Sequence, residues 1–369
     1  MGPGLHPHTL PSPPKTHKLN RDQLFHPKGN LHFFKSQFLT RLPYPSGSYA
    51  GKTIIVTGSN TGLGLEAARH FVRLGCSRMI LAVRNTSKGA LAKSSIEKST
   101  KCSPDTISVW ELDQCSYSSV QSFASRASTE LDRVDILLLN AGVCPLTGPW
   151  KYYEQDEECI TVNVVSTFLL AFLVYPKLRA TARLFPDSSP TVTVVTSLAH
   201  TYTDFYLSRP SPPNQIFASL SSRNRPEATL DDHADQYFIS KLLQIFLVRA
   251  WAERCPVAKT GVTINCVQPG FVKSGLFKFD GSLMVAVAGV MQWVLARGTE
   301  GGSRCLVNAA GWGMGEGKGG KGENSHGKYL SDCRVEEPSE LVTGEEGKVL
   351  QERIWEELRG KLEGWWRGW

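Results

Sequence analysis

The chain has 369 residues, 41% hydrophobic and 20% charged, which suffices for one large α/β domain or two small ones. Its formal net charge of +7 would suit a nucleic-acid partner, but residues 1–50 carry +5 of it and the rest only +2. Because the globular part is nearly neutral, we expect no nucleic-acid partner.

Residues 1–45 are rich in proline, histidine and basic residues, so we expect a disordered extension before a domain that spans residues 46–369. The extension lacks the apolar core of a signal peptide. The longest apolar run, 282–296, is too short to predict a transmembrane span and reads better as a buried or groove-lining helix. Peripheral membrane contact through this run stays open as an alternative.

The nine cysteines are odd in number, scattered through apolar segments and form no C-x-x-C pair. This usage is typical of buried thiols in a reducing compartment rather than of a disulfide framework or a zinc site. We therefore expect a cytoplasmic protein without a bound metal.

From about residue 51, apolar runs of strand length alternate with helical patterns, such as the amphipathic helix expected at 65–75. Several runs are apolar on both sides of the pleat, which requires helices on both faces of the sheet. The sequence therefore predicts a doubly wound, mostly parallel α/β sheet of seven strands. The runs are 53–58, 78–83, 106–112, 134–142, 191–197, 261–267 and 327–332.

Two stretches interrupt this alternation. Residues 203–231 hold four prolines, and residues 311–326 include seven glycines among their first twelve residues. We interpret the first as a loop on the substrate side and the second as a flexible surface insertion.

A glycine-rich turn follows the first strand in "TIIVTGSNTGLGLEAARH", with glycines at 58, 62 and 64. Backbone without Cβ atoms can turn tightly and approach a pyrophosphate, whose charge the N–H groups of the next helix then meet. The turn between a clear strand and a clear helix predicts a dinucleotide site that includes Ser59 and Leu63.

The second strand ends in "LAVRN", with Arg84 where an NAD-selective site would carry a carboxylate. A guanidinium there can clamp a 2′-phosphate, so NADP is favoured over NAD. An exposed loop arginine without this role is the alternative.

Three polar residues further along the chain are candidates for proton chemistry. Ser197 ends the fifth strand, and Tyr237 and Lys241 stand one helical turn apart in "YFISK". A free tyrosine has a pKa of about 10, which a nearby ammonium and an oxidised nicotinamide would lower toward a usable acid/base. An ordinary amphipathic pair on a helix is the alternative.

The series T-G-x-x-x-G-x-G at 57–64, N-A-G at 140–142, Asn163, Ser197, Y-x-x-x-K and P-G-F-V at 269–272 resembles the short-chain dehydrogenase/reductase family. The resemblance implies a single Rossmann-like domain. It also implies that Ser197 binds the substrate oxygen, Tyr237 is the acid/base and Lys241 assists it. Asn163 would anchor a water that links the lysine to solvent as a proton relay.

The same resemblance implies cofactor contacts beyond the glycine loop. Asp113 would contact the adenine and Asn140 the ribose, while Pro269, Gly270, Val272 and Ser274 would lie near the nicotinamide. The chain departs from the family at Leu139, where an asparagine is usual, and at Ser274, where a threonine is usual. The separation of 40 positions between Ser197 and Tyr237 also exceeds the usual dozen or so, so their proximity is the least secure part of the expected geometry.

We thus predict an NADP-dependent oxidoreductase that acts on CH–OH groups and interconverts a ketone or aldehyde and an alcohol. Residues 271–296 and 203–231 would wall a pocket for a hydrophobic small molecule. The chain most resembles fungal reductases associated with secondary-metabolite pathways, and family habit suggests a homo-oligomer. The alternatives are a catalytically silent NADP-binding sensor or scaffold and a membrane-associated dehydrogenase of the retinoid or steroid type.

Overall fold

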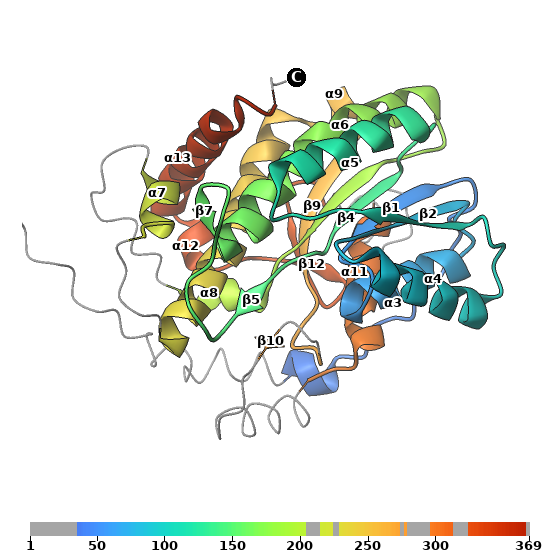
Figure 1. The fold of residues 1–369 in the computed structure, drawn as a ribbon, viewed down its shortest axis with the longest axis horizontal. Coiled ribbons are helices and arrows are strands. Elements are labelled where there is room, and N and C mark those ends of the chain that lie inside the picture. The colour runs from blue at the N-terminus through green and yellow to red at the C-terminus, as the bar shows by residue number, and fades with distance from the viewer. Residues whose placement is uncertain are drawn as a thin grey trace, which may run out of the picture.

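A twisted sheet of eight strands with helices on both faces runs through the protein (Figure 1). The computed structural model describes residues 35–203, 215–223, 229–273, 277–278, 296–312 and 324–366. The strands of the sheet are β1 (Thr53–Thr57), β2 (Arg78–Val83), β3 (Ile107–Glu111), β4 (Ile136–Leu139), β8 (Thr191–Val195), β9 (Thr263–Gln268), β11 (Tyr329–Ser331) and β12 (Arg334–Glu336).

The strand order across the sheet is β12-β11-β9-β8-β4-β1-β2-β3. The first seven strands in chain order pair in parallel, which confirms the predicted doubly wound, mostly parallel fold. β12 adds an antiparallel edge strand that was not predicted. It follows β11 through a tight turn in which Asp332 and Cys333 take positive φ angles of 49° and 61°.

The sheet reverses its strand order beside β1. The chain runs from β1 outward to β2 and β3, then returns to β4 on the other side of β1 and continues outward to β8. In open α/β sheets, ligands bind outside the carboxyl ends of the strands at such a switch point. The site is therefore expected where β1 and β4 end.

Each face of the sheet has its own set of helices. One hydrophobic cluster contains residues of α3 and α11, and the other contains residues of α6, α8 and α13. The long helices are α3 (Gly62–Arg73), α4 (Thr86–Thr100), α5 (Tyr117–Glu130), α6 (Ser166–Leu184), α8 (Leu230–Arg254), α11 (Thr299–Gly311) and α13 (Glu345–Leu362). Every residue of β1, β4 and β8 is buried, as two covered faces require.

Short elements complete the described chain. The helical ones are η1 (Lys35–Leu39), η2 (Ile160–Val165), η3 (Leu198–Tyr202), α7 (Ile216–Leu220), α9 (Val257–Thr260) and α12 (Glu340–Thr343). The two-residue strands are β5 (Cys144–Pro145), β6 (Tyr152–Tyr153), β7 (Asp156–Glu157) and β10 (Phe277–Lys278).

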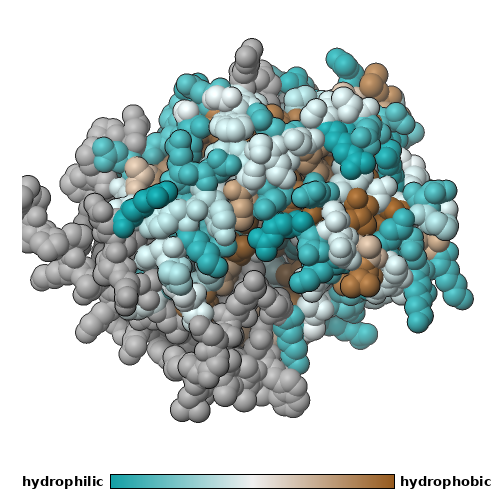
Figure 2. All heavy atoms as spheres, in the orientation of Figure 1, coloured by the Kyte–Doolittle hydropathy of each residue, from teal (hydrophilic) through white to brown (hydrophobic). Residues whose placement is uncertain are grey.

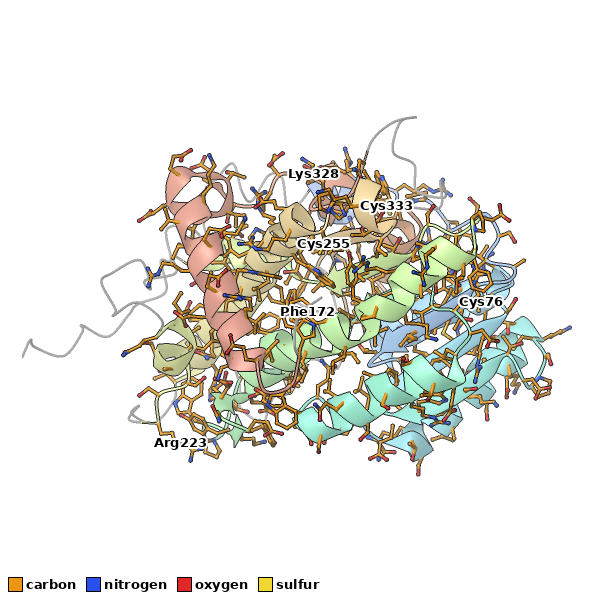
Figure 3. All side chains as sticks on the ribbon, turned by 90° about the horizontal axis from the view of Figure 1, so that it is seen from above. Cys76, Phe172, Arg223, Cys255, Lys328 and Cys333 are labelled. Atoms are coloured by element: carbon orange, nitrogen blue, oxygen red, sulfur yellow. The ribbon has the colours of Figure 1, made fainter. Side chains whose placement is uncertain are left out.

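Aromatic packing holds α13 against the helices beneath it. Phe172 of α6 contacts the rings of Trp251 on α8 and Trp355 on α13, at centroid distances of 5.0 and 5.7 Å. Figure 3 shows Phe172 on α6, near α13. The molecular face in Figure 2 is mostly hydrophilic where it is described, with scattered hydrophobic residues.

One described helical segment, Ile160–Leu184, is long and apolar enough to cross a membrane. Most of it is buried, 83% of its apolar window, and α6 packs against α5. Its apolar character is therefore that of a core helix. The apolar run at 282–296 lies outside the described residues.

The segments expected to lie outside the regular fold are only partly described. Within 203–231 the chain forms α7, and α8 starts at Leu230 with Thr229 as its N-cap. Most of 311–326 lies outside the described residues. Residues of η1, assigned above to the disordered extension, pack on the domain: Gln37 is buried and donates a hydrogen bond to the Phe271 carbonyl. The folded part therefore begins earlier than residue 46.

Candidate active site

The glycine loop joins β1 to α3 as predicted. Gly58 and Gly62 have φ angles of +64° and +61°, a region that favours glycine. A Cβ on Gly64 would lie 2.5 Å from Asn140 Nδ2 and 2.6 Å from the Gly58 carbonyl oxygen. The loop therefore needs glycine at 58 and 62 for conformation and at 64 for space.

Asn140, at the end of β4, braces this loop. Its side-chain amide donates to the carbonyl oxygens of Thr57 and Gly58, at 2.9 and 3.2 Å. In return, the Thr57 hydroxyl oxygen accepts from the backbone N–H groups of Asn140 and Ala141. Leu139 stands where the family that the chain resembles usually has an asparagine. Its side chain is buried in the hydrophobic core, so an apolar residue suits that position.

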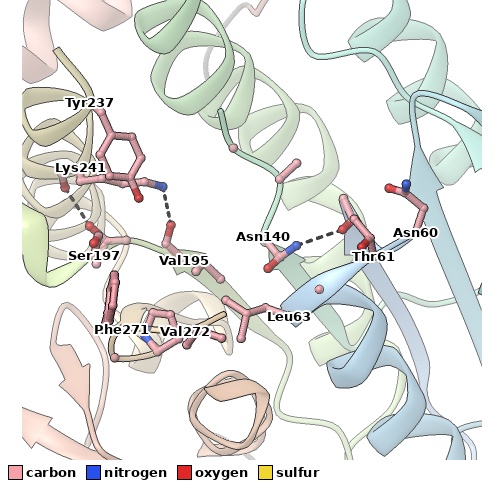
Figure 4. Close-up of a pocket in the computed structure, with 17 residues that line it drawn as sticks. Asn60, Thr61, Leu63, Asn140, Val195, Ser197, Tyr237, Lys241, Phe271 and Val272 are labelled. Carbon is pink, nitrogen blue, oxygen red and sulfur yellow. Dashed lines mark hydrogen bonds between the residues drawn. The ribbon is translucent and has the colours of Figure 1, made fainter. Parts of the chain in front are cut away.

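A pocket of about 300 Å³ opens at this edge of the sheet (Figure 4). It brings together predicted residues from distant parts of the sequence. From the glycine loop and β4 come Gly58, Gly62, Leu63 and Asn140. From the later segments come Ser197, Tyr237, Lys241, Pro269, Gly270 and Val272.

A second pocket of about 220 Å³ adjoins the first, and both are lined by Gly58, Asn60, Ala141 and Gly142. Arg84 and Asp113, the predicted adenosine-side residues, line it together with Lys88 in the first turn of α4. Because they share four lining residues, the two pockets form a continuous lining along the carboxyl ends of the strands, where dinucleotides bind in folds of this kind.

Ser197 and Tyr237 meet despite their separation of 40 positions. Ser197 follows β8 and caps η3, where its hydroxyl oxygen accepts from the Ala199 N–H at 3.1 Å. The side chains of Ser197 and Tyr237 line the same pocket. Lys241 Nζ lies 5.7 Å from the centroid of the Tyr237 ring (Figure 4).

Burial dominates the electrostatics of this pair. It raises the pKa of Tyr237 well above its ordinary value, and the Cys144 and Cys159 thiols add to the rise while the Ser197 side chain opposes it. Burial likewise lowers the pKa of Lys241 to about 8, against an opposing effect of the same two thiols. In the protein alone the pKa of Tyr237 is thus raised, whereas the lowering expected above includes the charge of an oxidised nicotinamide. The phenol holds its proton, the form that a proton donor requires.

Asn163 lies in η2 and is fully buried. Its side chain exchanges two hydrogen bonds with the backbone of Val143, at 2.8 and 3.0 Å, and donates a third to the Ser240 hydroxyl. Its backbone carbonyl accepts from the Gln244 amide at 2.6 Å. Asn163 therefore joins η2 to the segment after β4 and to α8, next to Lys241.

His200 is a site residue that the sequence reasoning missed. The Ser339 N–H donates to its Nε2 at 3.1 Å, so the proton of the neutral ring sits on Nδ1, which donates to the Ser197 carbonyl at 2.8 Å. These two hydrogen bonds fix the backbone of Ser197 to the segment before α12. The available signal was the "SLAH" spacing, which puts a histidine three residues after Ser197.

The remaining predicted residues are placed as follows. Ser59 is fully buried, and its hydroxyl has no hydrogen-bond partner among the described residues. Ser274 lies outside the described residues. In the described part of the chain, no group of three or more His, Cys, Asp or Glu side chains could hold a metal ion. All nine cysteines are free.

Residues 52–200 match the model of the short chain dehydrogenase family. Over 90% of its length the chain is 49% identical to the short chain dehydrogenase/reductase dmxR8 of Cryptosporiopsis sp., covering 96% of that protein. It is 43% identical to the short chain dehydrogenase atnD of Emericella nidulans, over 81% of the chain and 90% of the relative.

Solved structures show the same fold. A short chain dehydrogenase from Shigella flexneri superposes with a TM-score of 0.53 at 19% identity, covering 80% of this chain and 97% of that one. The RhlG/NADP active-site complex of Pseudomonas aeruginosa gives 0.52 at 18% identity, covering 78% and 97%. Fold and site define an oxidoreductase of the Rossmann type. The chain belongs to the short-chain dehydrogenase/reductase family.

Replacing Gly64 by alanine should destabilise the protein by about 1–3 kcal/mol, because the new methyl group would collide with the Asn140 amide and the Gly58 carbonyl. Gly301→Ala in α11 is the matched control: nothing lies within 4 Å of its Cβ position, so stability should rise by about 0.5–1 kcal/mol. Urea unfolding of both variants measures the difference. Equal effects would contradict the role of the close contact.

Burial lowers the pKa of His200 from 6.5 to about 4. The unfolded chain therefore binds a proton in this range that the folded chain does not, and the free energy of unfolding falls as the pH drops from 6.5 toward 4. His200 should contribute a loss of about 2 kcal/mol between pH 7 and pH 5. Urea unfolding at both pH values should show a weaker pH dependence for His200→Asn; an unchanged dependence would refute the assignment.

Proposed function

We propose that the protein is an NADP-dependent reductase that interconverts a ketone or aldehyde and an alcohol on a hydrophobic small molecule. The observation that carries the proposal is the meeting of Ser197, Tyr237 and Lys241 in one pocket beside the glycine loop. These three groups supply what carbonyl reduction needs beyond a hydride: an oxygen-binding donor, a proton donor and a cation.

The proposed mechanism follows from the protonation states. The bound dinucleotide supplies the hydride. Ser197 donates a hydrogen bond to the carbonyl oxygen of the substrate, and Tyr237 transfers its phenolic proton to that oxygen as negative charge develops. Lys241 stabilises the phenolate that Tyr237 becomes, since an ammonium nearby favours the charged form. In the oxidative direction the same groups act in reverse order.

The residues of the site suit a dinucleotide. At Gly62 nothing lies within 4 Å of the position of a Cβ, so the loop is open on that side, and the buried Ser59 hydroxyl lacks a partner among the described residues. For the phosphorylated form, the support is that Arg84 and Lys88 both line the adenosine-side pocket. Two cations there suit a 2′-phosphate, although Asp113 in the same pocket reduces the positive potential.

The substrate is proposed to be hydrophobic because apolar side chains surround Tyr237. Leu146 and Ala199 cluster with it, and Tyr202 and Phe238 pack against them. The fungal relatives agree with a role in secondary metabolism. The free thiols are consistent with a cytoplasmic location, and a homo-oligomer is part of the proposal on family habit alone.

The variant Tyr237→Phe tests the proton donor. It should lower kcat for NADPH-dependent reduction of a hydrophobic ketone by about 10²–10⁴-fold, because it removes only the proton donor. NADPH affinity, measured by fluorescence titration, should change little. Tyr175→Phe, a buried tyrosine of α6, is the control and should retain near-normal turnover. Full turnover in Tyr237→Phe would refute the mechanism, and tight NADPH binding without turnover on any substrate would favour a silent binding protein.

Arg84→Ala tests the choice of cofactor. The KM for NADPH should rise about tenfold, the effect of losing one charge-assisted hydrogen bond, while the KM for NADH stays unchanged. Lys93→Ala, further along α4, serves as the control for lost positive charge. A parallel change in both KM values for Arg84→Ala would argue against recognition of the 2′-phosphate.

A further inference from the structure

Gln244 is a fully buried amide that touches the catalytic lysine. It lies three residues after Lys241 on α8, with 1% of its surface exposed. Lys241 Nζ donates to Gln244 Oε1 at 3.2 Å, and Gln244 Nε2 donates to the Asn163 carbonyl oxygen at 2.6 Å. A chain of two hydrogen bonds thus joins the lysine ammonium to the backbone of η2.

The two neighbours fix the orientation of the amide. An ammonium offers only donors and a backbone carbonyl only acceptors, so the oxygen must face Lys241 and the N–H₂ group must face Asn163. In the reversed amide, the N–H₂ group would face the Lys241 ammonium, so two donors would meet, and the oxygen would face the Asn163 carbonyl, so two acceptors would meet. Gln244 therefore presents a fixed, neutral acceptor to the lysine.

Lys241 has three N–H groups to satisfy. The Val195 carbonyl accepts one at 2.9 Å and Gln244 accepts a second. Among the described residues the third has no acceptor, so it is available to the pocket that Lys241 lines together with Tyr237. Because the Val195 carbonyl and the Gln244 amide fix the orientation of the ammonium, its third N–H is directed toward the pocket.

We propose that Gln244 is a positioning residue of the reaction, which holds Lys241 charged and aimed at the pocket by bridging it to the Asn163 carbonyl. The inference rests on the proposed function. Gln244 takes the place between Asn163 and the lysine that the family resemblance assigns to a bound water. The link from Asn163 to the lysine is accordingly a side chain of the protein.

The charge state of Lys241 reflects all its neighbours. The titratable groups that face it are Tyr237 on the same helix, Cys144 of β5 and Cys159 before η2. Burial lowers its pKa to about 8, so a lost acceptor would make the ammonium harder to keep at neutral pH. The neutral Gln244 amide supports the charged form without adding a buried negative charge.

The test measures the pKa of Lys241 directly, by NMR titration of lysine side chains labelled with carbon-13, with Lys241→Met used for assignment. Gln244→Met keeps the side-chain volume but removes the acceptor, so the pKa of Lys241 should fall by about one pH unit. The alkaline limb of the kcat/KM profile should move to lower pH by the same amount. In Gln244→Glu the acceptor remains, and the pKa of Lys241 should stay unchanged or rise.

Gln351→Met provides the matched control. Gln351 is also buried and bridges α13 to α8 through Arg249 and Glu253, at 3.2 and 2.9 Å. Its loss should lower stability but leave the pKa of Lys241 and the pH profile in place. An unchanged pKa in Gln244→Met, or an equal fall in Gln244→Glu, would overturn the inference. A shifted pKa in a protein that reduces no carbonyl would uphold the positioning role and reject the proposed function.

Discussion

The site depends on one side-chain amide, that of Asn140, which ties the carboxyl ends of β1 and β4 together. It occupies the space that a Cβ on Gly64 would need and holds the loop of β1 in its left-handed turn at Gly58. β1 and β4 flank the point where the strand order reverses. The hydrogen bonds of Asn140 therefore hold the backbone at Gly58 and Ala141, which line both pockets. The glycines at 58 and 64, the Asn140 amide and the strand order together determine the shape of the loop.

Local patterns in the sequence were sufficient to predict the parallel strands, the glycine loop and the Tyr237–Lys241 pair, because each depends on residues a few positions apart. What escaped prediction depends on contacts across the fold. His200 meets Ser339 across 139 residues, Gln244 meets Asn163 across 81, and Gln37 meets Phe271 across 234. β12 was missed because its three residues, RVE, contain a single apolar side chain and therefore show no alternation of apolar and polar residues.

The pKa values of Tyr237 and Lys241 also depend on the fold in a way that the sequence does not show. Charge could be read from the sequence, so Lys241 was expected to lower the pKa of Tyr237. Desolvation could not be read, and in the fold it is the largest effect on both groups, raising the pKa of the phenol and lowering that of the ammonium. Burial thus favours the neutral form of both side chains, and Tyr237 keeps its phenolic proton.

The long connection between Ser197 and Tyr237 has a consequence for how the site is held together. Each hydroxyl is anchored independently, the serine by β8 and His200 and the tyrosine by α8. The distance between the two residues along the chain therefore does not decide how close their hydroxyls lie, although α7 within the connection is itself packed in the core through Ile216, Phe217 and Leu220. Because each anchor belongs to the sheet-and-helix framework of the fold, a chain of this kind can carry a long insertion between two neighbouring site residues at a modest cost in loop-closure entropy.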